Sequence, residues 1–372
     1  MRVLFVSVPL LGHLFPMVPL AEALRVAGHE VLLAAGGSAL AARRSGLPVE
    51  DIAPAFDFGR IARRTLLRHP LIARAELAGG AGTRAVAPMF GAANDQMADG
   101  VLGLADRWQP DLVVHEPLAV AGALAAAHRA VPAVLHENSL YDGPELVRVT
   151  AAWLARARRR TGIGSLPPSA ATLTIAPPTV VGERAGWPMR GIPYAGVGEL
   201  PDWLREPCER PRILVSRSTV AGPGGGNLMR AVVAAAPEAA AEFVLVRPDL
   251  WVLRRGSLPT NVRTVDWIPI NAALPTCAGV VHHGGAGSVL GALAAGVPQL
   301  VVTGPGDRRY NATLVAARGA GLAVAERKVT GAELTRLVTD AGVAAAADEV
   351  RREMAGMPAP ADLVPRLEAL VG

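Results

Sequence analysis

Residues 282–288, HHGGAGS, combine two histidines with three glycines and are well suited to bind an anion. The apolar run CAGVVHH predicts a buried strand before the glycines, and SVLGALAAG predicts a helix that ends at Gly296. The first turn of a helix carries backbone N–H groups that lack intrahelical partners, and these groups bind anions. The expected ligand is a diphosphate, to which His283 would donate a further hydrogen bond. The amide donors belong to Gly285, Ala286, Gly287 and Ser288.

His13 and Glu116 are the pair best placed for acid–base chemistry. His13 lies in VPLLGHLFP, between a predicted strand and a predicted helix, and Glu116 ends the predicted strand PDLVVHE. Ligands of doubly wound sheets bind at the carboxyl ends of the strands, so we expect both side chains at that edge. A carboxylate bonded to one ring nitrogen fixes the histidine tautomer, and the other nitrogen can then remove a proton. Alternatively, His13 caps the adjacent helix and Glu116 is a solvated strand end.

The glycine loop does not match the common nucleotide-binding fingerprints. A nicotinamide dinucleotide fingerprint needs glycines at its first, third and sixth positions, and counting from Gly285 the sixth residue is Leu290. Asp307 follows the next predicted strand, about where a ribose-binding acid is expected, so a dinucleotide stays open. A Walker loop needs a lysine after its glycines, and the single lysine, Lys328, follows no glycine loop. A second GGAG, at residues 79–82, lies between helical stretches and is expected to be a plain loop.

These residues need parallel strands to position them, and the hydrophobic pattern predicts two sheets. The first half alternates the strands RVLFVSV, EVLLAAG, PDLVVHE and PAVLHEN with helices such as MVPLAEALRVAG. A second series runs through RILVS, FVLVRP, NVRTV, GVVHH, PQLVV and GLAVA. Proline is dense around residues 163–211, which indicates a connection between domains. The predicted fold class is α/β, with two doubly wound, Rossmann-like domains facing each other across a cleft.

Length and composition fit a soluble two-domain protein and exclude several classes. The chain has 372 residues, and its net charge of +5 is too small for that length to indicate nucleic acid. The two cysteines, Cys208 and Cys277, leave no disulfide framework or metal cluster and fit a reducing cytoplasm. Pro9, Gly12 and Pro16 interrupt the apolar N-terminus, which therefore predicts strand, loop and helix rather than a signal peptide. No apolar stretch is long enough to span a bilayer.

The segment 267–311 gives a more specific indication. Its sequence, WIPINAALPTCAGVVHHGGAGSVLGALAAGVPQLVVTGPGDRRYN, resembles the donor-binding signature of nucleotide-sugar-dependent glycosyltransferases of the GT-B fold. It is most similar to the bacterial enzymes that decorate enediyne, macrolide and aromatic polyketide antibiotics. GHLFP and MPAPADLVPRLE, near the two ends, are similar to the same group, so the resemblance covers essentially the whole chain. We expect an acceptor-binding domain at 1–200, a donor-binding domain at 201–356, and a C-terminal helix at 357–372 that packs back on the first domain.

The resemblance implies a role for each residue of a donor-binding site. Trp267 would stack its indole ring on the nucleobase, and the backbone of Ile268 would read the edge of the base. Asp307 would accept hydrogen bonds from sugar hydroxyls. His283 and the glycine-loop amides would stabilise the departing diphosphate, so neither a metal ion nor a cofactor is expected.

Two positions depart from the pattern of this group. Arg308 follows the acidic residue where many relatives have glutamine, and its charge would alter sugar choice or turn to the phosphate. The first strand of the donor domain is followed by SRST, with Ser218 where relatives tend to have glycine. We still expect the hydroxyls of Ser216 and Thr219 to contact the nucleotide.

The predicted reaction is an inverting displacement at the anomeric carbon of a TDP-sugar or UDP-sugar. His13 would take the proton of an acceptor hydroxyl while Glu116 stabilises the imidazolium. A rigid, apolar natural product is the expected acceptor, because large apolar side chains lie outside the predicted strands of the first domain. These side chains, which core packing explains equally well, are Phe56, Phe58, Met89, Phe90, Tyr141 and Trp153.

The sequence leaves several alternatives open. An NAD(P)-dependent oxidoreductase would reuse the glycine loop and Asp307, but it leaves GHLFP and Trp267 unexplained. A catalytically inactive accessory protein would have lost its base, whereas His13 and Glu116 are both present. Transfer to a carbon atom instead of an oxygen and a homodimeric state are both compatible with the sequence. The sugar, the aglycone and the choice between TDP and UDP do not follow from it.

Overall fold

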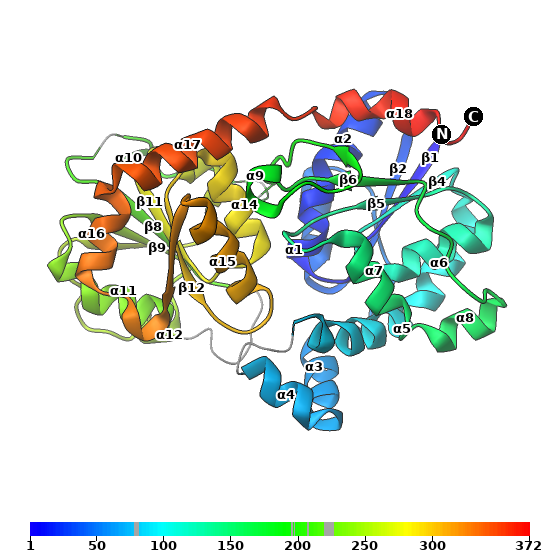
Figure 1. The fold of residues 1–372 in the computed structure, drawn as a ribbon, viewed down its shortest axis with the longest axis horizontal. Helices are drawn as coiled ribbons and strands as arrows, with labels where there is room; N and C mark the ends of the chain where they lie inside the picture. The colour runs from blue at the N-terminus through cyan, green and yellow to red at the C-terminus, as the bar shows by residue number, and fades with distance from the viewer. Residues whose placement is uncertain (78–81, 195, 197, 207, 219–226) are drawn as a thin grey trace. The chain divides into compact units, whose positions relative to one another are not determined.

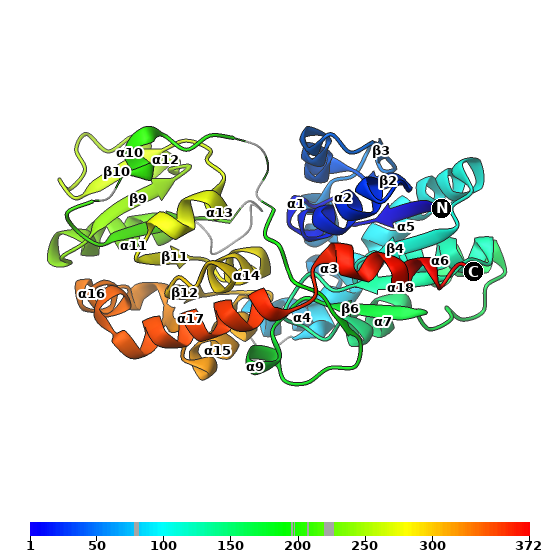
Figure 2. The same cartoon turned by 90° about the horizontal axis from the view of Figure 1, so that it is seen from above.

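The computed structural model describes residues 1–372 except 78–81, 195, 197, 207 and 219–226 (Figure 1). The chain forms two compact units. The first comprises residues 1–176, 183–196 and 357–372, and the second comprises 177–182 and 197–356. Each unit is built on its own parallel sheet with helices on its flanks (Figures 1 and 2).

The first sheet has seven parallel strands in the described part of the chain, in the order β3-β2-β1-β4-β5-β6-β7. The strands are β1 (Arg2–Val6), β2 (Glu30–Ala35), β3 (Val49–Asp51), β4 (Leu112–His115), β5 (Ala133–His136), β6 (Ala171–Thr174) and β7 (Trp187–Pro188). The central strands β1, β4 and β5 are almost wholly buried, because helices cover both faces of a doubly wound sheet. Their near-continuous apolar sequences follow from that burial.

The helices of the first unit alternate with these strands, and the longest, α5, carries Pro88 in its interior. They are α1 (Leu11–Leu14), α2 (Val18–Val26), α3 (Phe58–Arg68), α4 (Pro70–Leu77), α5 (Thr83–Trp108), α6 (Val120–Arg129), α7 (Gly143–Ala151), α8 (Ala155–Thr161) and α18 (Val364–Glu368). The 3-10 turns are η1 (Phe15–Met17), η2 (Gly37–Ser45) and η6 (Pro360–Leu363).

The C-terminal segment 357–372 belongs to the first unit. Glu368 on α18 lies 2.9 Å from Nε2 of His29, and the guanidinium of Arg366 lies 3.9 Å from the ring centroid of Trp187. The segment 177–182, which lies within the sequence-predicted first domain, belongs to the second unit. There the backbone N–H of Thr179 donates to Glu353 at 3.0 Å.

The second sheet has six parallel strands among the described residues, in the order β10-β9-β8-β11-β12-β13. The strands are β8 (Arg212–Ser216), β9 (Glu242–Val246), β10 (Val262–Val265), β11 (Gly279–His282), β12 (Gln299–Thr303) and β13 (Gly321–Ala325). The helices are α9 (Pro178–Val181), α10 (Asp202–Arg205), α11 (Leu228–Ala235), α12 (Leu250–Leu253), α13 (Ile270–Ala273), α14 (Ala286–Ala295), α15 (Arg308–Arg318), α16 (Gly331–Thr339) and α17 (Ala341–Gly356). The 3-10 turns are η3 (Ala236–Glu238), η4 (Leu274–Thr276) and η5 (Glu326–Lys328).

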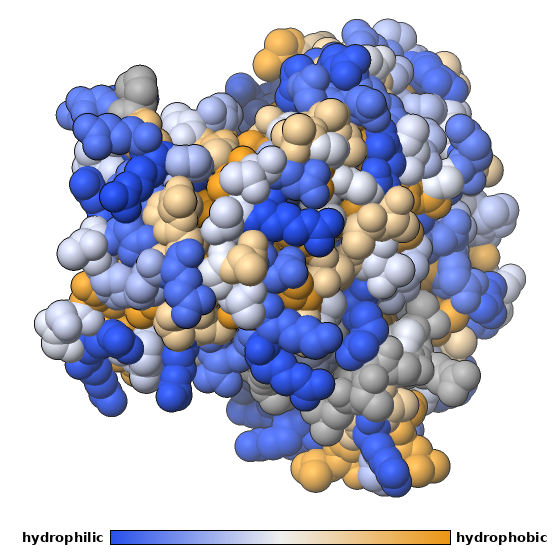
Figure 3. Space-filling view, turned by 60° about the vertical axis from the view of Figure 1, so that its left-hand side comes forward, coloured by the Kyte–Doolittle hydropathy of each residue, from blue (hydrophilic) through white to orange (hydrophobic). Residues whose placement is uncertain are grey.

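The α3–α4 hairpin carries the most exposed leucines of the described surface. Leu67 is 75% exposed and Leu71 is 81% exposed. Hydrophobic residues are visible on the surface projection at the bottom of Figure 3. Arginines on the same hairpin, including Arg64 and Arg68, are exposed as well, so its outer surface is amphipathic. Within the described ranges, no helix has the length and apolar character that a membrane span requires.

Candidate active site

His13 is presented at the carboxyl edge of the first sheet by the short helix α1. This helix follows β1 and begins after Leu10, and the backbone N–H of Leu11 donates to the hydroxyl of Ser38. Nδ1 of His13 lies 3.4 Å from Oε2 of Glu116. The His13 side chain is 24% exposed, whereas that of Glu116 is fully buried. The predicted contact between the two residues is therefore present, and the other ring nitrogen, Nε2, makes no hydrogen bond to a described residue.

Backbone amides hold the Glu116 carboxylate in place. Oε1 accepts a hydrogen bond from the N–H of Val8 at 3.2 Å, and Oε2 accepts one from the N–H of Leu118 at 2.8 Å. Burial by itself raises the pKa of Glu116, but the positive charge of protonated His13 and these hydrogen bonds outweigh it. The pKa of Glu116 therefore lies below its ordinary value, and the group carries a negative charge at neutral pH.

Asn138, which the sequence reasoning missed, is the third member of this cluster. Its amide nitrogen lies 3.2 Å from Oε2 of Glu116 and 3.3 Å from Nδ1 of His13. Nδ1 donates to Glu116 in one tautomer of His13 and accepts from Asn138 in the other. Asn138 follows strand β5, as Glu116 follows the neighbouring strand β4, so its place at the same edge could have been read from the sequence.

Aromatic rings extend from His13 along one side of the first unit. The ring centroids of His13 and Phe90 are 5.6 Å apart, and those of Phe90 and Phe58 are 5.5 Å apart. Phe56 continues the row, 6.4 Å from Phe58. Four predicted acceptor-binding residues, Phe56, Phe58, Met89 and Tyr141, are partly buried against the hydrophobic core, and Phe90 is 7% exposed.

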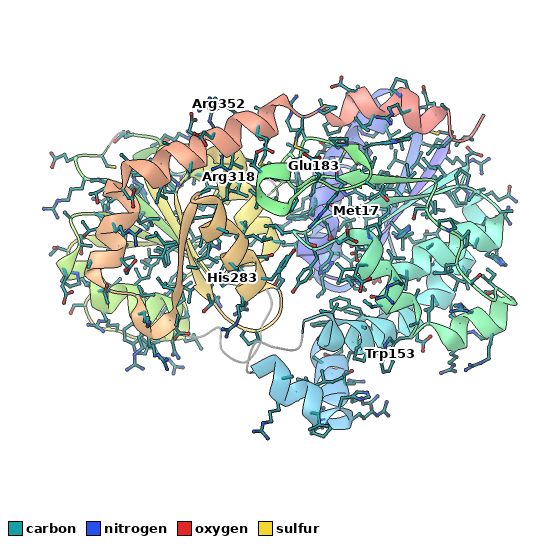
Figure 4. All side chains as sticks on the ribbon, in the orientation of Figure 1. Met17, Trp153, Glu183, His283, Arg318 and Arg352 are labelled. Carbon is teal, nitrogen blue, oxygen red and sulfur yellow. The ribbon has the colours of Figure 1, made fainter. Side chains whose placement is uncertain are left out.

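Trp153, the sixth predicted acceptor-binding residue, is not part of this row. Trp153, labelled in Figure 4, is 45% exposed. Its ring meets that of His69 edge-on, with centroids 5.8 Å apart. A side chain at Gly91 of α5 would collide with it, with Cβ only 2.3 Å from the Cβ of Trp153. Trp153 therefore packs on α5 and on His69, which lies between α3 and α4, whereas the five others lie against the core.

The glycine loop of the second unit joins β11 to α14 and is shaped by a buried histidine. Nδ1 of His282 accepts a hydrogen bond from the N–H of Gly284 at 3.0 Å, and Nε2 lies 2.9 Å from Oε1 of Gln299. Burial lowers the pKa of His282 to about 4. Gly284 has a φ of +82°, and a Cβ there would lie 2.9 Å from Val301, so this position requires glycine.

His283, labelled in Figure 4, follows His282 and has a different environment. Burial, followed by the charges of His282 and Arg308, lowers the pKa of His283 to about 3. Its Nδ1 is buried and has no hydrogen-bond partner among the described residues. His283 is therefore neutral at physiological pH and offers a hydrogen bond rather than a full charge.

The side chain of Asp307 contacts the glycine loop where α14 begins. Its Oδ2 accepts hydrogen bonds from the N–H of Ala286 at 3.3 Å and from the amide of Asn311 at 2.8 Å. The N–H of Ser288 donates to the carbonyl of Gly285 at 3.0 Å. Of the three amides of α14 predicted to bind a diphosphate, that of Gly287 alone has no acceptor in the described part of the chain. Asn311 also donates to the carbonyl of Gly284, and the sequence reasoning did not single it out.

The remaining predicted donor-site residues lie at the carboxyl edge of the second sheet. Trp267, two residues beyond β10, is 45% exposed, whereas Ile268 is 3% exposed. Ser216 is the last residue of β8 and is 5% exposed. Arg308 opens α15, and burial lowers its pKa against the opposing effect of Asp307. Thr219 lies outside the described residues.

Two doubly wound parallel sheets, the second carrying a glycine loop at a helix N-terminus, form the architecture of the GT-B glycosyltransferases. The predicted fold class is thus confirmed. No group of three or more His, Cys, Asp or Glu side chains within the described ranges is arranged to hold a metal ion.

Comparison with known families is more specific. Residues 22–218 match the N-terminal domain of the erythromycin biosynthesis protein CIII-like family, and residues 230–370 match its C-terminal domain. The chain belongs to this family and is a glycosyltransferase of antibiotic biosynthesis. The predicted resemblance is confirmed.

Individual relatives cover the whole chain. Elloramycin glycosyltransferase ElmGT of Streptomyces olivaceus is 38% identical over 390 residues, which cover 100% of this chain and 98% of ElmGT. The crystal structure of SnogD from Streptomyces nogalater matches with a TM-score of 0.84 and 35% identity, covering 100% of this chain and 99% of SnogD. SsfS6 of Streptomyces sp. SF2575, in complex with thymidine diphosphate, matches with a TM-score of 0.82 and 30% identity, covering 99% of each chain.

Proposed function

We propose that this glycosyltransferase moves a sugar from a TDP-sugar to a hydroxyl of an apolar natural-product aglycone, with inversion at the anomeric carbon. The observation that supports this most is the 3.4 Å contact between the partly exposed His13 and the buried Glu116. The complex of SsfS6 with thymidine diphosphate supports TDP as the nucleotide. The relationship to an elloramycin glycosyltransferase supports a natural-product acceptor.

In the proposed mechanism, Nδ1–H of His13 donates to Glu116, so that Nε2 is unprotonated and faces the acceptor. Nε2 takes the proton of the acceptor hydroxyl as that oxygen bonds to the anomeric carbon. The bond from this carbon to the diphosphate breaks at the same time, and TDP leaves with the bonding electrons. Glu116 stabilises the imidazolium, because its carboxylate is ionised and fixed by two backbone amides.

On the donor side, the N-terminus of α14 and His283 stabilise the departing diphosphate. The Gly287 amide is available for a hydrogen bond, and the positive end of the helix dipole adds to it. The amide of Ala286 becomes available only when Asp307 releases it. We propose that Asp307 turns from this amide to the sugar hydroxyls when the donor binds, and that Arg308 lies beside them.

Apolar rings beside His13 support an apolar acceptor. Phe90 and Phe58 form the row of rings nearest to the proposed base, and Phe56, Met89 and Tyr141 extend the apolar surface. Trp153 is the least supported acceptor contact, because it packs on α5 and His69, apart from that row. The homodimeric state and the cytoplasmic location stay predictions.

Trp267→Ala is expected to weaken the affinity for TDP by about 1–3 kcal/mol, the range measured for the loss of an aromatic ring that stacks on a base. Isothermal titration calorimetry with TDP measures this directly. Trp251→Ala is a matched control, because Trp251 lies in the same unit on α12 and has no proposed contact with the nucleotide. An unchanged affinity of the Trp267 variant would remove this residue from the donor site.

The function itself is tested by incubating the enzyme with TDP-sugars and a panel of aromatic polyketide and macrolide aglycones. Mass spectrometry is expected to show a product heavier than the aglycone by one sugar less one water, together with released TDP. A fluorescence titration with NADPH is expected to show no binding. Binding of NADPH by an enzyme that does not bind TDP would favour the oxidoreductase alternative instead.

A further inference from the structure

Two arginines follow neighbouring strands at the carboxyl edge of the second sheet. Arg217 comes directly after β8, and Arg247 comes directly after β9, whose last residue, Val246, pairs with Ser216. Nε of Arg217 donates a hydrogen bond to the carbonyl of Arg247 at 2.7 Å. This bond fixes the direction of the Arg217 side chain, and its terminal nitrogens make no hydrogen bond to a residue that the structure describes.

Neither guanidinium pairs with a carboxylate of a described residue. No ion pair joins Arg217 or Arg247 to an acidic residue in the described part of the chain, although both side chains are half-buried. Burial, and then the charge of Arg217, lowers the pKa of Arg247. Two like charges held close together without a counter-charge destabilise the fold. Arrangements of this kind are typical of sites that bind a ligand of opposite charge.

The backbone conformation of Arg247 is also energetically unfavourable. Its φ is +54°, in the left-handed region that residues with a Cβ seldom adopt. Strain of this kind persists where the surrounding structure requires it, and it clusters at functional sites. In this backbone conformation the guanidinium of Arg247 lies 5.4 Å from the ring centroid of Trp267.

The strand order places the arginines between two proposed parts of the donor site. Along the edge, β10, β9, β8 and β11 are followed by Trp267, Arg247, Arg217 and His283, in that order. Neighbouring strands lie about 4.8 Å apart, so the edge from β10 to β11 spans about 14 Å. A nucleotide with its base on Trp267 and its diphosphate at His283 must cross both arginines.

We propose that Arg217 and Arg247 form a two-arginine site for the phosphates of the nucleoside diphosphate, with Arg247 also packing against the ring of Trp267. This inference rests on the proposed function, because it assumes that the donor lies along this edge. Guanidinium groups match phosphate oxygens with paired N–H donors, so the site distinguishes ligands by their negative charge. The leaving group is neutralised by these two side chains in addition to the glycine loop and His283.

The test compares TDP with uncharged thymidine as calorimetric ligands. The double variant Arg217→Gln/Arg247→Gln is expected to bind TDP about 10- to 100-fold more weakly, the loss typical of a hydrogen bond to a charged group. Its affinity for thymidine is expected to stay within about twofold of the wild-type value. Arg217→Lys/Arg247→Lys keeps both charges, and we expect it to lose less TDP affinity than the glutamine variant.

Arg255→Gln is the matched control, because Arg255 also lies over a tryptophan ring, 5.1 Å from the centroid of Trp251, in the same unit. It is expected to bind both ligands like the wild type. Unchanged TDP affinity in the glutamine variant would overturn the inference, and so would an equal loss for TDP and thymidine, which indicates a purely structural role. A folded wild-type enzyme that does not bind TDP at all would instead refute the proposed function.

Discussion

His13→Ala is expected to lower turnover by about 100- to 10,000-fold, the usual contribution of a general base, while the affinity for TDP stays at the wild-type value. The reason is that His13 belongs to the first unit and the glycine loop to the second. Removing the imidazole takes away the proton acceptor without changing a residue proposed to bind the nucleotide. Steady-state transfer rates and calorimetry with TDP, measured on the same preparation, separate the two effects.

His128→Ala is a suitable control for this experiment, because it removes a histidine of α6 that pairs with Asp106 and has no proposed catalytic role. Its turnover should match that of the wild type. Glu116→Gln keeps the shape of the buried side chain but removes its charge, so it should lower turnover as well, by a smaller factor than His13→Ala. Wild-type turnover in the His13 variant would exclude this residue as the base.

The free energy of unfolding is expected to fall steeply as the pH is lowered from about 6.5 to about 4. Burial lowers the pKa of His136 and of His282 from 6.5 to about 4, and that of His283 to about 3. Below pH 6.5 the unfolded chain takes up protons that the folded chain does not, so each histidine destabilises the fold by up to about 1.4 kcal/mol per pH unit. The summed loss is comparable to a typical stability of about 5–15 kcal/mol.

Two buried carboxyl groups, those of Glu116 and Glu137, modify this dependence with opposite signs. The lowered pKa of Glu116 adds to the loss of stability in acid, because its ionised form is the one that the fold stabilises. Burial raises the pKa of Glu137, which therefore favours the folded state as it takes up a proton. Burial lowers the pKa of His115 as well, so the buried histidines act in one direction and dominate the pH dependence.

Urea denaturation followed by tryptophan fluorescence at pH 8, 6.5, 5.5 and 4.5 measures this effect. Midpoints are expected to be similar at pH 8 and 6.5 and to fall at each lower pH. His282→Gln removes one titrating group and should make the slope shallower by up to one proton. Midpoints that do not change between pH 6.5 and 4.5 would contradict the neutral, buried state of these histidines.

The sequence pattern was sufficient for the framework of the site, because parallel strands bring their carboxyl ends to one edge. His13 and Glu116, which are far apart in the chain, were paired on that ground, and the structure brings them to 3.4 Å. The same rule applied to β5 would have added Asn138. Asn138 was missed because asparagine is common after strands for several reasons. Its hydrogen bonds to side chains that are distant in sequence produce no pattern in the residues around it.

Contacts that depend on side-chain packing could not be predicted from the sequence pattern. The two adjacent histidines, His282 and His283, look alike in sequence. His282 shapes the loop from within the core, whereas Nδ1 of His283 has no hydrogen-bond partner among the residues that the structure describes. Nor does the sequence indicate that Asp307 bonds to the amide of Ala286, because that contact joins segments from two different loops. That Arg217 and Arg247 have no carboxylate partner among the described residues likewise depends on their three-dimensional surroundings.

The most direct test of base-assisted displacement by His13 is the configuration of the sugar in the product. A TDP-sugar of known anomeric configuration is incubated with the enzyme and an accepted aglycone, and the anomeric proton of the purified glycoside is observed by NMR. One in-line displacement predicts the anomeric configuration opposite to that of the donor. A glycoside with the donor's configuration would contradict the mechanism, since it requires either two displacements or attack from the face that the diphosphate leaves.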